Sequence, residues 1–258
     1  MTPGAVSRGR RGVVVLLVLS MACLASLPSR GAAAARVARG DATRTEPSGH
    51  GRARVPGRVA VARLQYGGGG DWYANPTSLR NLLRAVRTRT ALAIDTVERT
   101  VTLRDPAVMD YDMLHVTGHG TMTLAPDEIA RLRQYVLQGG FVHVDDNYGL
   151  DSSFRQIARQ AFPDRALVDV PLSHPIYHVV YDFPKGLPKI HEHDGKPARG
   201  YGIFVGDRLA LYYSHSADLG NGWEDVGTYR DDPPALHEQA LRMGVNLVTY
   251  AVTSRVLP

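Results

Sequence analysis

Cysteine is almost absent from this chain of 258 residues: Cys23, in an apolar segment near the N-terminus, is the only one. A single cysteine excludes an intramolecular disulfide. If the N-terminal segment is removed, the rest of the chain also lacks a thiol nucleophile and a thiolate metal ligand. The sequence therefore argues against cysteine-based catalysis in the body of the protein.

Acidic residues are missing from residues 1–40, which contain six arginines. Residues 13–27 form an apolar run, and the alanines at 32–34 suit a cleavage site. A basic start, a short apolar run and small residues predict a secretory signal peptide over residues 1–35. The run is shorter than the roughly 20 residues that span a bilayer. An uncleaved anchor stays open as an alternative. So does a lipoprotein attached through Cys23, although Ser20 stands where such signals usually have leucine.

Excess basic charge is also missing beyond this segment. The chain has a net charge of +5, and the six arginines of residues 1–40 contribute +6 to it. Residues 41–58 add four arginines and two acids, so the part from residue 59 onward carries −3. A nucleic-acid-binding domain is expected to show a basic patch. We therefore predict no nucleic-acid partner.

Residues 36–58 mix arginine, glycine, proline and serine without periodicity and predict a flexible linker. The remaining part, residues 59–255, suits one domain. We expect the protein to be periplasmic or secreted, with a small molecule or a cell-envelope protein as its partner. Contact with a membrane is expected only if the N-terminal segment is retained or Cys23 carries a lipid.

Strand-like and helix-like patterns alternate along the domain. A strand–helix–strand unit with short joints favours a parallel crossover. The whole pattern predicts a doubly wound, mostly parallel α/β sheet with an added β-hairpin. The predicted elements are strands at 58–66, 91–104, 113–116 and 141–146, helices at 79–90, 126–137, 152–162 and 233–253, strand and loop at 165–183, and a hairpin at 202–213.

Polar residues follow two of the predicted strands. His119 lies between Gly118 and Gly120, and Asp145, Asp146 and Asn147 end the strand that begins at residue 141. Ligand sites of doubly wound sheets lie beyond the carboxyl ends of the strands. We predict that His119 and one of the two aspartates form an acid–base pair in a crevice there. The alternative is that both aspartates are caps or turn residues and that His119 is structural.

Aromatic residues and histidines give weaker signals. Trp72, Tyr73 and Trp223 are candidate walls for a flat ligand, although such residues are more often packed in a core. His174 is a candidate ligand contact in a loop. His191, His193 and Asp194 are the densest group of potential metal ligands, but no spacing matches a strong metal motif. We therefore predict solvated loop histidines, no metal and no cofactor.

Several motifs resemble the DUF4159 family of uncharacterised bacterial proteins: Asp71-Trp72 followed by Asn75-Pro76, "TGHG", "LRQYVLQGG" and "VDD". The segments "SSFRQIARQAFPD", "HPIY" and "DRLALYYS" extend the resemblance over most of residues 59–255. The family in turn resembles class I glutamine amidotransferase-like domains. This implies a doubly wound, flavodoxin-like layout with a crevice at the strand ends. It also implies a glycine-rich turn at Gly118 and Gly120 whose amides can face an oxyanion.

The amidotransferase relatives have a nucleophilic cysteine just beyond the strand equivalent to Phe141–Val144, where this chain has Asp145, Asp146 and Asn147. A glutaminase needs such a thiol, so the resemblance extends to the fold and the crevice and not to that reaction. We expect a ligand-binding or hydrolase-like domain that has no cysteine nucleophile. A catalytically inactive scaffold and a metal-dependent hydrolase are the alternatives, and whether the protein is an enzyme stays open.

Overall fold

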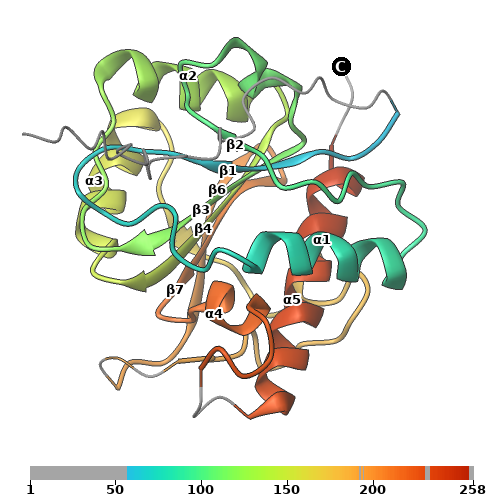
Figure 1. The fold of residues 1–258 in the computed structure, drawn as a ribbon. Helices are drawn as coiled ribbons and strands as arrows, with labels where there is room; N and C mark the ends of the chain where they lie inside the picture. Colours follow the sequence, from blue (N-terminus) through green and yellow to red (C-terminus); the bar gives the residue numbers. More distant parts are fainter. Residues whose placement is uncertain (1–56, 192, 194, 230–232, 256–258) are drawn as a thin grey trace, which may run out of the picture. The chain divides into compact units, whose positions relative to one another are not determined.

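The computed structural model describes residues 57–191, 193, 195–229 and 233–255 (Figure 1). The predicted signal peptide and nearly all of the predicted linker lie outside these residues. Within the described part of the chain, no helix combines the length and the apolar character needed to cross a membrane.

The described residues form a seven-stranded sheet with the order β2-β1-β3-β4-β7-β6-β5. The first five strands in this order are parallel, whereas β6 is antiparallel to β7 and β5 to β6. This confirms the predicted mostly parallel sheet with an added hairpin. The strands are β1 (Val61–Leu64), β2 (Thr100–Val101), β3 (Met113–His119), β4 (Phe141–Tyr148), β5 (Val168–Asp169), β6 (Arg199–Val205) and β7 (Arg208–His215).

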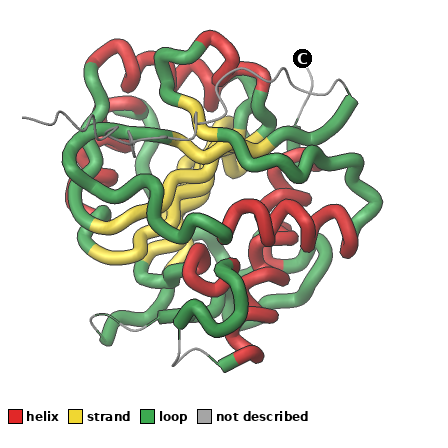
Figure 2. The backbone as a smooth tube through the Cα atoms, viewed as in Figure 1, coloured by secondary structure: helices red, strands yellow, loops and turns green. Residues whose placement is uncertain are grey.

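Helices cover both faces of the sheet, as the doubly wound fold requires (Figure 2). One apolar cluster joins α2 and α3 to one face, and a second joins α1, α4 and α5 to the other (Figure 1). The helices are α1 (Ser78–Arg89), α2 (Pro126–Leu137), α3 (Asp151–Ala161), α4 (Leu219–Trp223) and α5 (Pro234–Thr253), with short 3-10 turns at Pro106–Asp110 and Pro175–Tyr177.

The β3–α2–β4 unit forms as its sequence predicts. Pro126 begins α2, where a missing N–H costs nothing, and the Glu128 carboxylate accepts a 2.9 Å hydrogen bond from the Ala125 N–H. The two strands are parallel and adjacent, with Thr117 opposite Asp145. The polar tips of β3 and β4 therefore lie at one edge of the sheet, which confirms the topological part of the prediction.

Two segments differ from the expected pattern. Residues 91–104 contain only the two-residue strand β2 and an isolated bridge at Ile94, because Asp95 binds the Val97 N–H and Arg99 and so forms a local turn. The helix α4 has no sequence signal, since two of its five residues are glycines. A side-chain carbon at Gly222 would lie 2.3 Å from Cβ of Ala240 in α5, so tertiary packing requires glycine there.

Arg63 on β1 is almost fully buried and binds the loop that follows its strand. Its Nε donates to Glu98 at 2.7 Å. Its two other nitrogens donate to the carbonyl oxygens of Ala74, at 2.7 Å, and Asn75, at 3.0 Å. One guanidinium thus joins the central sheet to the loop and to the start of α1.

We predict that Arg63→Met lowers the free energy of unfolding by about 3–5 kcal/mol, because Glu98 and buried carbonyl groups lose their partner. Arg104→Met is the matched control. Arg104 makes a two-point pair with Asp127 at 2.8 and 3.0 Å, but its side chain is 60% exposed, so the loss expected for this variant is much smaller. Urea unfolding measures both, and equal losses would contradict the structural role of Arg63.

Candidate functional site

His119 pairs with Asp71 at the carboxyl edge of the sheet. The distance between His119 Nδ1 and Asp71 Oδ2 is 3.0 Å, and the other carboxylate oxygen accepts the His119 backbone N–H. Among the described residues, neither Asp145 nor Asp146 hydrogen-bonds to His119. The carboxylate that pairs with His119 in the structure is therefore that of Asp71, and not that of Asp145 or Asp146. Asp71 lies in a motif that carried the family resemblance, but sequence reasoning did not identify it as the partner.

Glycines allow this pairing because two loops pack backbone against backbone. A side-chain carbon at Gly118 would lie 2.3 Å from the Tyr66 hydroxyl and 3.0 Å from the Asp71 carbonyl oxygen. At Gly70 it would lie 2.8 Å from the Thr121 carbonyl oxygen. The four-glycine stretch 67–70 and the "TGHG" turn are thus complementary surfaces.

The expected oxyanion role of the turn is not supported at Gly120. Its N–H donates to the carbonyl oxygen of Tyr148 at 2.9 Å, so the group is already used within the protein. Gly120 also has a φ of +81°, in the left-handed region that favours glycine. The turn therefore shapes the backbone around His119.

Asp145 is fully buried and joins three elements. It accepts hydrogen bonds from Ser214 Oγ at 2.6 Å, from Gly220 N at 2.7 Å and from Leu219 N at 3.2 Å. Burial raises the pKa of Asp145 to about 6, although these hydrogen bonds oppose the rise. Asp145 therefore anchors α4 to β4 and β7, and this is the structural alternative considered for it.

Asp146 lies on the opposite face of β4, as strand alternation requires. It accepts hydrogen bonds from the Leu150 N–H at 3.1 Å and from the Tyr213 hydroxyl at 2.9 Å. Burial raises the pKa of its carboxyl above the usual range. Asp146 supports the start of α3 and also lines a pocket of about 280 Å³. The residues that line this pocket are Asp146, Asn147, Tyr148, Gly149, Asp151, Ser152, His193, Lys196, His215 and Ser216.

Three buried asparagines contribute polar atoms to the edge of the sheet. Asn75 accepts from the Tyr229 hydroxyl at 2.8 Å, and Asn147 accepts from Thr117 Oγ1 at 3.0 Å. Asn221 donates to Asp218 at 2.8 Å. The second amide atom of each side chain has no partner among the described residues. Buried polar groups are rarely left unpaired, so these three amides are notable features of the carboxyl edge.

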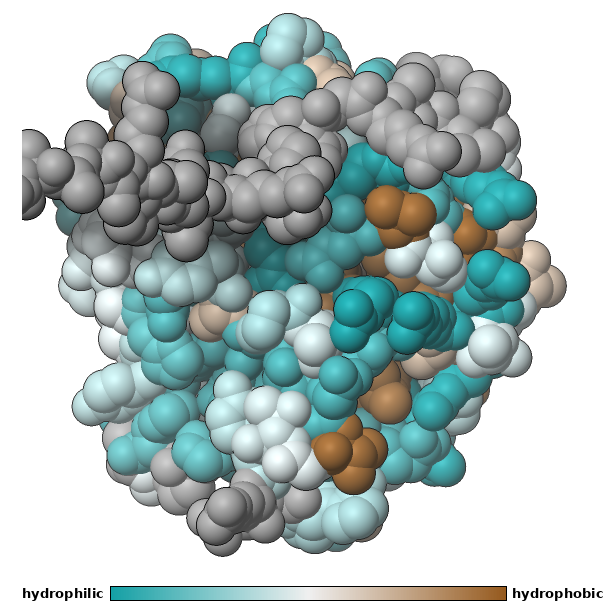
Figure 3. Space-filling view, viewed as in Figure 1, coloured by the Kyte–Doolittle hydropathy of each residue, from teal (hydrophilic) through white to brown (hydrophobic). Residues whose placement is uncertain are grey.

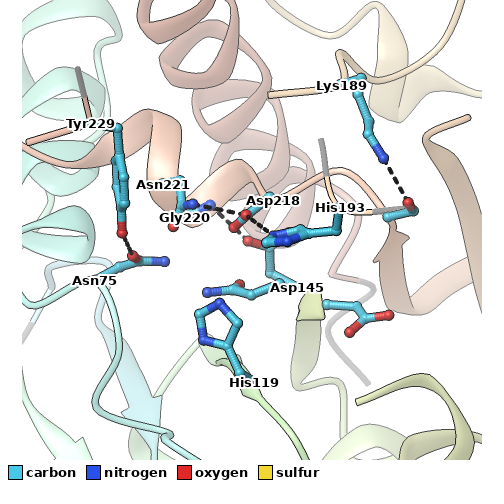
Figure 4. A network of polar contacts seen from close by, with 12 residues as sticks. Asn75, His119, Asp145, Lys189, His193, Asp218, Gly220, Asn221 and Tyr229 are labelled. Carbon is cyan, nitrogen blue, oxygen red and sulfur yellow. Dashed lines mark hydrogen bonds and ion pairs between the residues drawn. The ribbon is translucent and has the colours of Figure 1, made fainter. Parts of the chain in front are cut away.

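His193 faces this region from a loop. Its Nε2 lies 3.1 Å from Asp218 Oδ2, and its ring centroid lies 6.1 Å from that of His119. Figure 4 shows His119, His193 and the amide nitrogen of Asn75 directed toward one region beside Gly220 and Asn221. The network thus combines two imidazoles with the buried amides. Sequence reasoning had grouped His193 with His191 and Asp194, and Asp194 lies outside the described residues.

The other predicted ligand contacts divide into two groups. Tyr73 is exposed and forms an edge-on pair with the partly buried Trp72, next to Asp71. The predictions for Trp223 and His174 are not supported by their positions. Trp223 is fully buried, and its Nε1 donates to the Ala240 carbonyl oxygen at 2.8 Å. His174 packs against Phe204 and Tyr250, near the start of β7 and therefore away from the strand tips.

His115 and His143 form a stacked, fully buried pair below the site. Their Nδ1 atoms lie 3.1 Å apart, and His143 Nε2 lies 2.9 Å from Ser214 Oγ, which also donates to Asp145. Burial lowers the pKa of His143 to about 3 and the pKa of His115 well below its usual value. Both rings are therefore neutral at physiological pH and belong to the internal hydrogen-bond network.

One comparison with known proteins confirms the resemblance to the DUF4159 family. A family model described as "Domain of unknown function (DUF4159)" matches residues 60–252. A search of curated proteins finds no match. The matched residues include every strand of the sheet, the His119–Asp71 pair and the three buried asparagines.

The buried histidine pair predicts a loss of stability in mild acid. In the unfolded chain, His143 has the ordinary histidine pKa of about 6.5. In the folded protein, burial lowers this pKa to about 3. Below pH 6.5 protonation therefore favours the unfolded state. At pH 5, His143 alone should lower the free energy of unfolding by about 2 kcal/mol. Urea unfolding from pH 5 to 8 should show a weaker acid dependence in His143→Gln.

His178→Gln is the matched control for this series. The pKa of His178 is raised by the Leu172 carbonyl oxygen and by Asp182, so its linkage has the opposite sign. The His178→Gln variant should therefore lose at least as much stability between pH 8 and pH 5 as the unaltered protein. An unchanged pH profile in His143→Gln would contradict the assignment of a neutral buried ring.

Proposed function

The chain belongs to the DUF4159 family, and from this premise we propose that it is an exported, hydrolase-like domain that binds a small polar ligand at the carboxyl edge of its sheet. His119 is the acid–base group, and Asp71 is the carboxylate that orients it. The proposal keeps the predicted crevice and the predicted histidine, and replaces the predicted aspartate partner.

The pairing of His119 with Asp71 is the observation that carries this proposal. A carboxylate that accepts a hydrogen bond from Nδ1 holds the imidazole in one tautomer, with Nε2 as the base, and stabilises the imidazolium that forms. The distance of 3.0 Å between His119 Nδ1 and Asp71 Oδ2 suits such a bond. The His119 side chain is 42% exposed, so a substrate or a water molecule can approach its ring.

The buried amides support a small polar ligand. Asn75 and Asn147 provide N–H donors, and Asn221 provides a carbonyl acceptor. A ligand that carries both acceptors and donors, such as one with hydroxyl or amide groups, suits this mixture of donor and acceptor atoms. Asp145 and Asp218 lie in the same network and disfavour an anionic group. The chemistry of the edge therefore favours a neutral polar ligand.

No residue from 59 onward is a cysteine, so a thiol nucleophile is not part of the proposed reaction. In general-base hydrolysis the imidazole takes a proton from water as the water attacks the substrate, and it can return that proton to the leaving group. The His119–Asp71 pair suits this role, because it needs only a fixed tautomer and access to water.

We predict that His119→Ala lowers turnover by about 10²–10⁴-fold, the usual contribution of a general base, with little change in the free energy of unfolding. A panel of p-nitrophenyl esters, phosphates and glycosides, together with a peptide amide, provides the assay. Asp71→Asn should cause a smaller loss with the same substrate. Full activity in His119→Ala would overturn the proposed role.

The control is His178→Ala, which removes the histidine of another His–Asp pair in a separate surface segment. This variant should keep full activity. Comparable losses in both variants would point to a general loss of structure and would not support a special role of His119.

A scaffold that binds a cell-envelope protein is the competing interpretation. Such interfaces commonly contain a large exposed apolar patch. On the face seen in Figure 3, apolar residues occur in small groups separated by polar residues. The buried amides and the His119–Asp71 pair favour a small ligand over this alternative. Failure of the whole substrate panel would favour the scaffold.

Export is the second part of the proposal, supported by the basic start, the apolar run and the alanines of residues 1–35. We predict a mature chain that begins near residue 35, measured by intact-mass spectrometry of the periplasmic or culture fraction. Cys23→Ser should give the same mature mass. A mass that retains residues 1–30, or a lipid on Cys23, would contradict the cleaved soluble form.

A further inference from the structure

Three potential metal ligands meet where β4 and β7 end and α3 begins. Asp146 lies near the end of β4, Asp151 is the first residue of α3, and His215 is the last residue of β7. One ligand atom from each lies within 4.8 Å of the others. We propose that Asp146, Asp151 and His215 bind a divalent transition-metal ion. The proposal is independent of the acid–base role of His119.

A single hydroxyl group lies between the two carboxylates. The Tyr213 hydroxyl is 2.9 Å from Asp146 Oδ2 and 2.9 Å from Asp151 Oδ1. A phenol has one hydrogen to donate, so it satisfies only one of these two acceptors at a time. Two carboxylates around one donor are mutually repulsive, and a cation between them removes that repulsion.

His215 is directed at the carboxylates without a hydrogen bond to them. The distance from its Nε2 to Asp151 Oδ1 is 3.7 Å, which is too long for a hydrogen bond. Its Nδ1 is buried and has no partner among the described residues. The His215 ring is mostly buried, and neither of its nitrogens has a hydrogen bond among the described residues. The described part of the chain therefore leaves both nitrogens without such a partner. Coordination through Nε2 would engage this ring.

The surrounding pocket has room for the rest of a coordination shell. All three ligands line the pocket of about 280 Å³, which is large enough for several water molecules. The pocket therefore has space for water molecules beside the three metal-binding groups.

Arg155 modifies the charge of the site without blocking it. Its Nε donates to Asp151 Oδ1 at 2.7 Å, and its guanidinium lies 4.5 Å from the centre of the Tyr201 ring. The arginine orients Asp151 and offsets one negative charge. Asp151 Oδ2 has no hydrogen bond among the described residues, so it is available to a metal ion.

The ligand set indicates which ions fit. One imidazole nitrogen with two carboxylates suits Zn²⁺ or Mn²⁺, whereas Mg²⁺ and Ca²⁺ prefer oxygen ligands alone. With three protein ligands, the remaining coordination positions are left for water or a bound ligand.

Isothermal titration of the tag-free, EDTA-treated mature protein with Zn²⁺, and separately with Mn²⁺, tests the proposal. One equivalent of at least one ion should bind. Asp151→Asn and His215→Gln should each weaken that binding at least tenfold. His178→Gln, at the exposed His–Asp pair elsewhere, should leave it unchanged. His119→Ala should also keep the stoichiometry, which separates this result from failure of the proposed hydrolase function.

Absence of stoichiometric binding of both ions would overturn the proposal. So would binding that survives in the Asp151→Asn/His215→Gln double variant, because the ion would then lie elsewhere, for example at His191 and His193. Circular dichroism and melting temperature of the metal-free variants establish that they fold. Asp151 is 37% exposed, so its single variant is expected to fold and carries the test even if His215→Gln does not.

Discussion

The buried carboxylate of Asp145 is the interaction on which the arrangement of the carboxyl edge depends. It binds a side chain of β7 and the first two amides of α4, and so holds a glycine-containing helix against the tips of two strands. This placement brings Asp218 and Asn221 to the edge. The three hydrogen bonds do not fully offset the cost of burial, since the pKa of Asp145 is still raised to about 6. Asp145 therefore fixes the position of α4, while its own charged form is disfavoured by burial.

A second constraint acts on the other side of the edge. Arg63 holds the carbonyl groups of the loop after β1, and the glycines of that loop let it pack directly against the "TGHG" turn. Together they bring Asp71 to His119. The buried amides of Asn75 and Asn147 belong to the same edge as this pair and α4. The candidate site is thus assembled by two independent anchors.

Strand alternation gives the end of β4 two roles. Asp145 and Asn147 face the side of α4, whereas Asp146 faces Tyr213 and α3. One short segment therefore contributes both to the amide-lined edge and to the proposed metal pocket on the other face. His193 connects the two, because it contacts Asp218 and also lines the pocket. A metal ion in that pocket would lie near the ligand that the edge binds, but its binding requires none of the residues assigned to acid–base chemistry.

The sequence by itself determined the α/β class, the β3–α2–β4 crossover and the shared edge of His119 and Asp145, because these follow from local periodicity, caps and the handedness of parallel connections. Only the tertiary structure decided the partner of His119, the anchoring role of Asp145, the burial of Trp223 and the formation of α4. Each depends on contacts between residues far apart in the chain: 48 positions separate Asp71 from His119, and 75 separate Asp145 from Gly220. Such contacts leave no periodic signal, since they arise from loops whose paths are set by packing against the finished sheet.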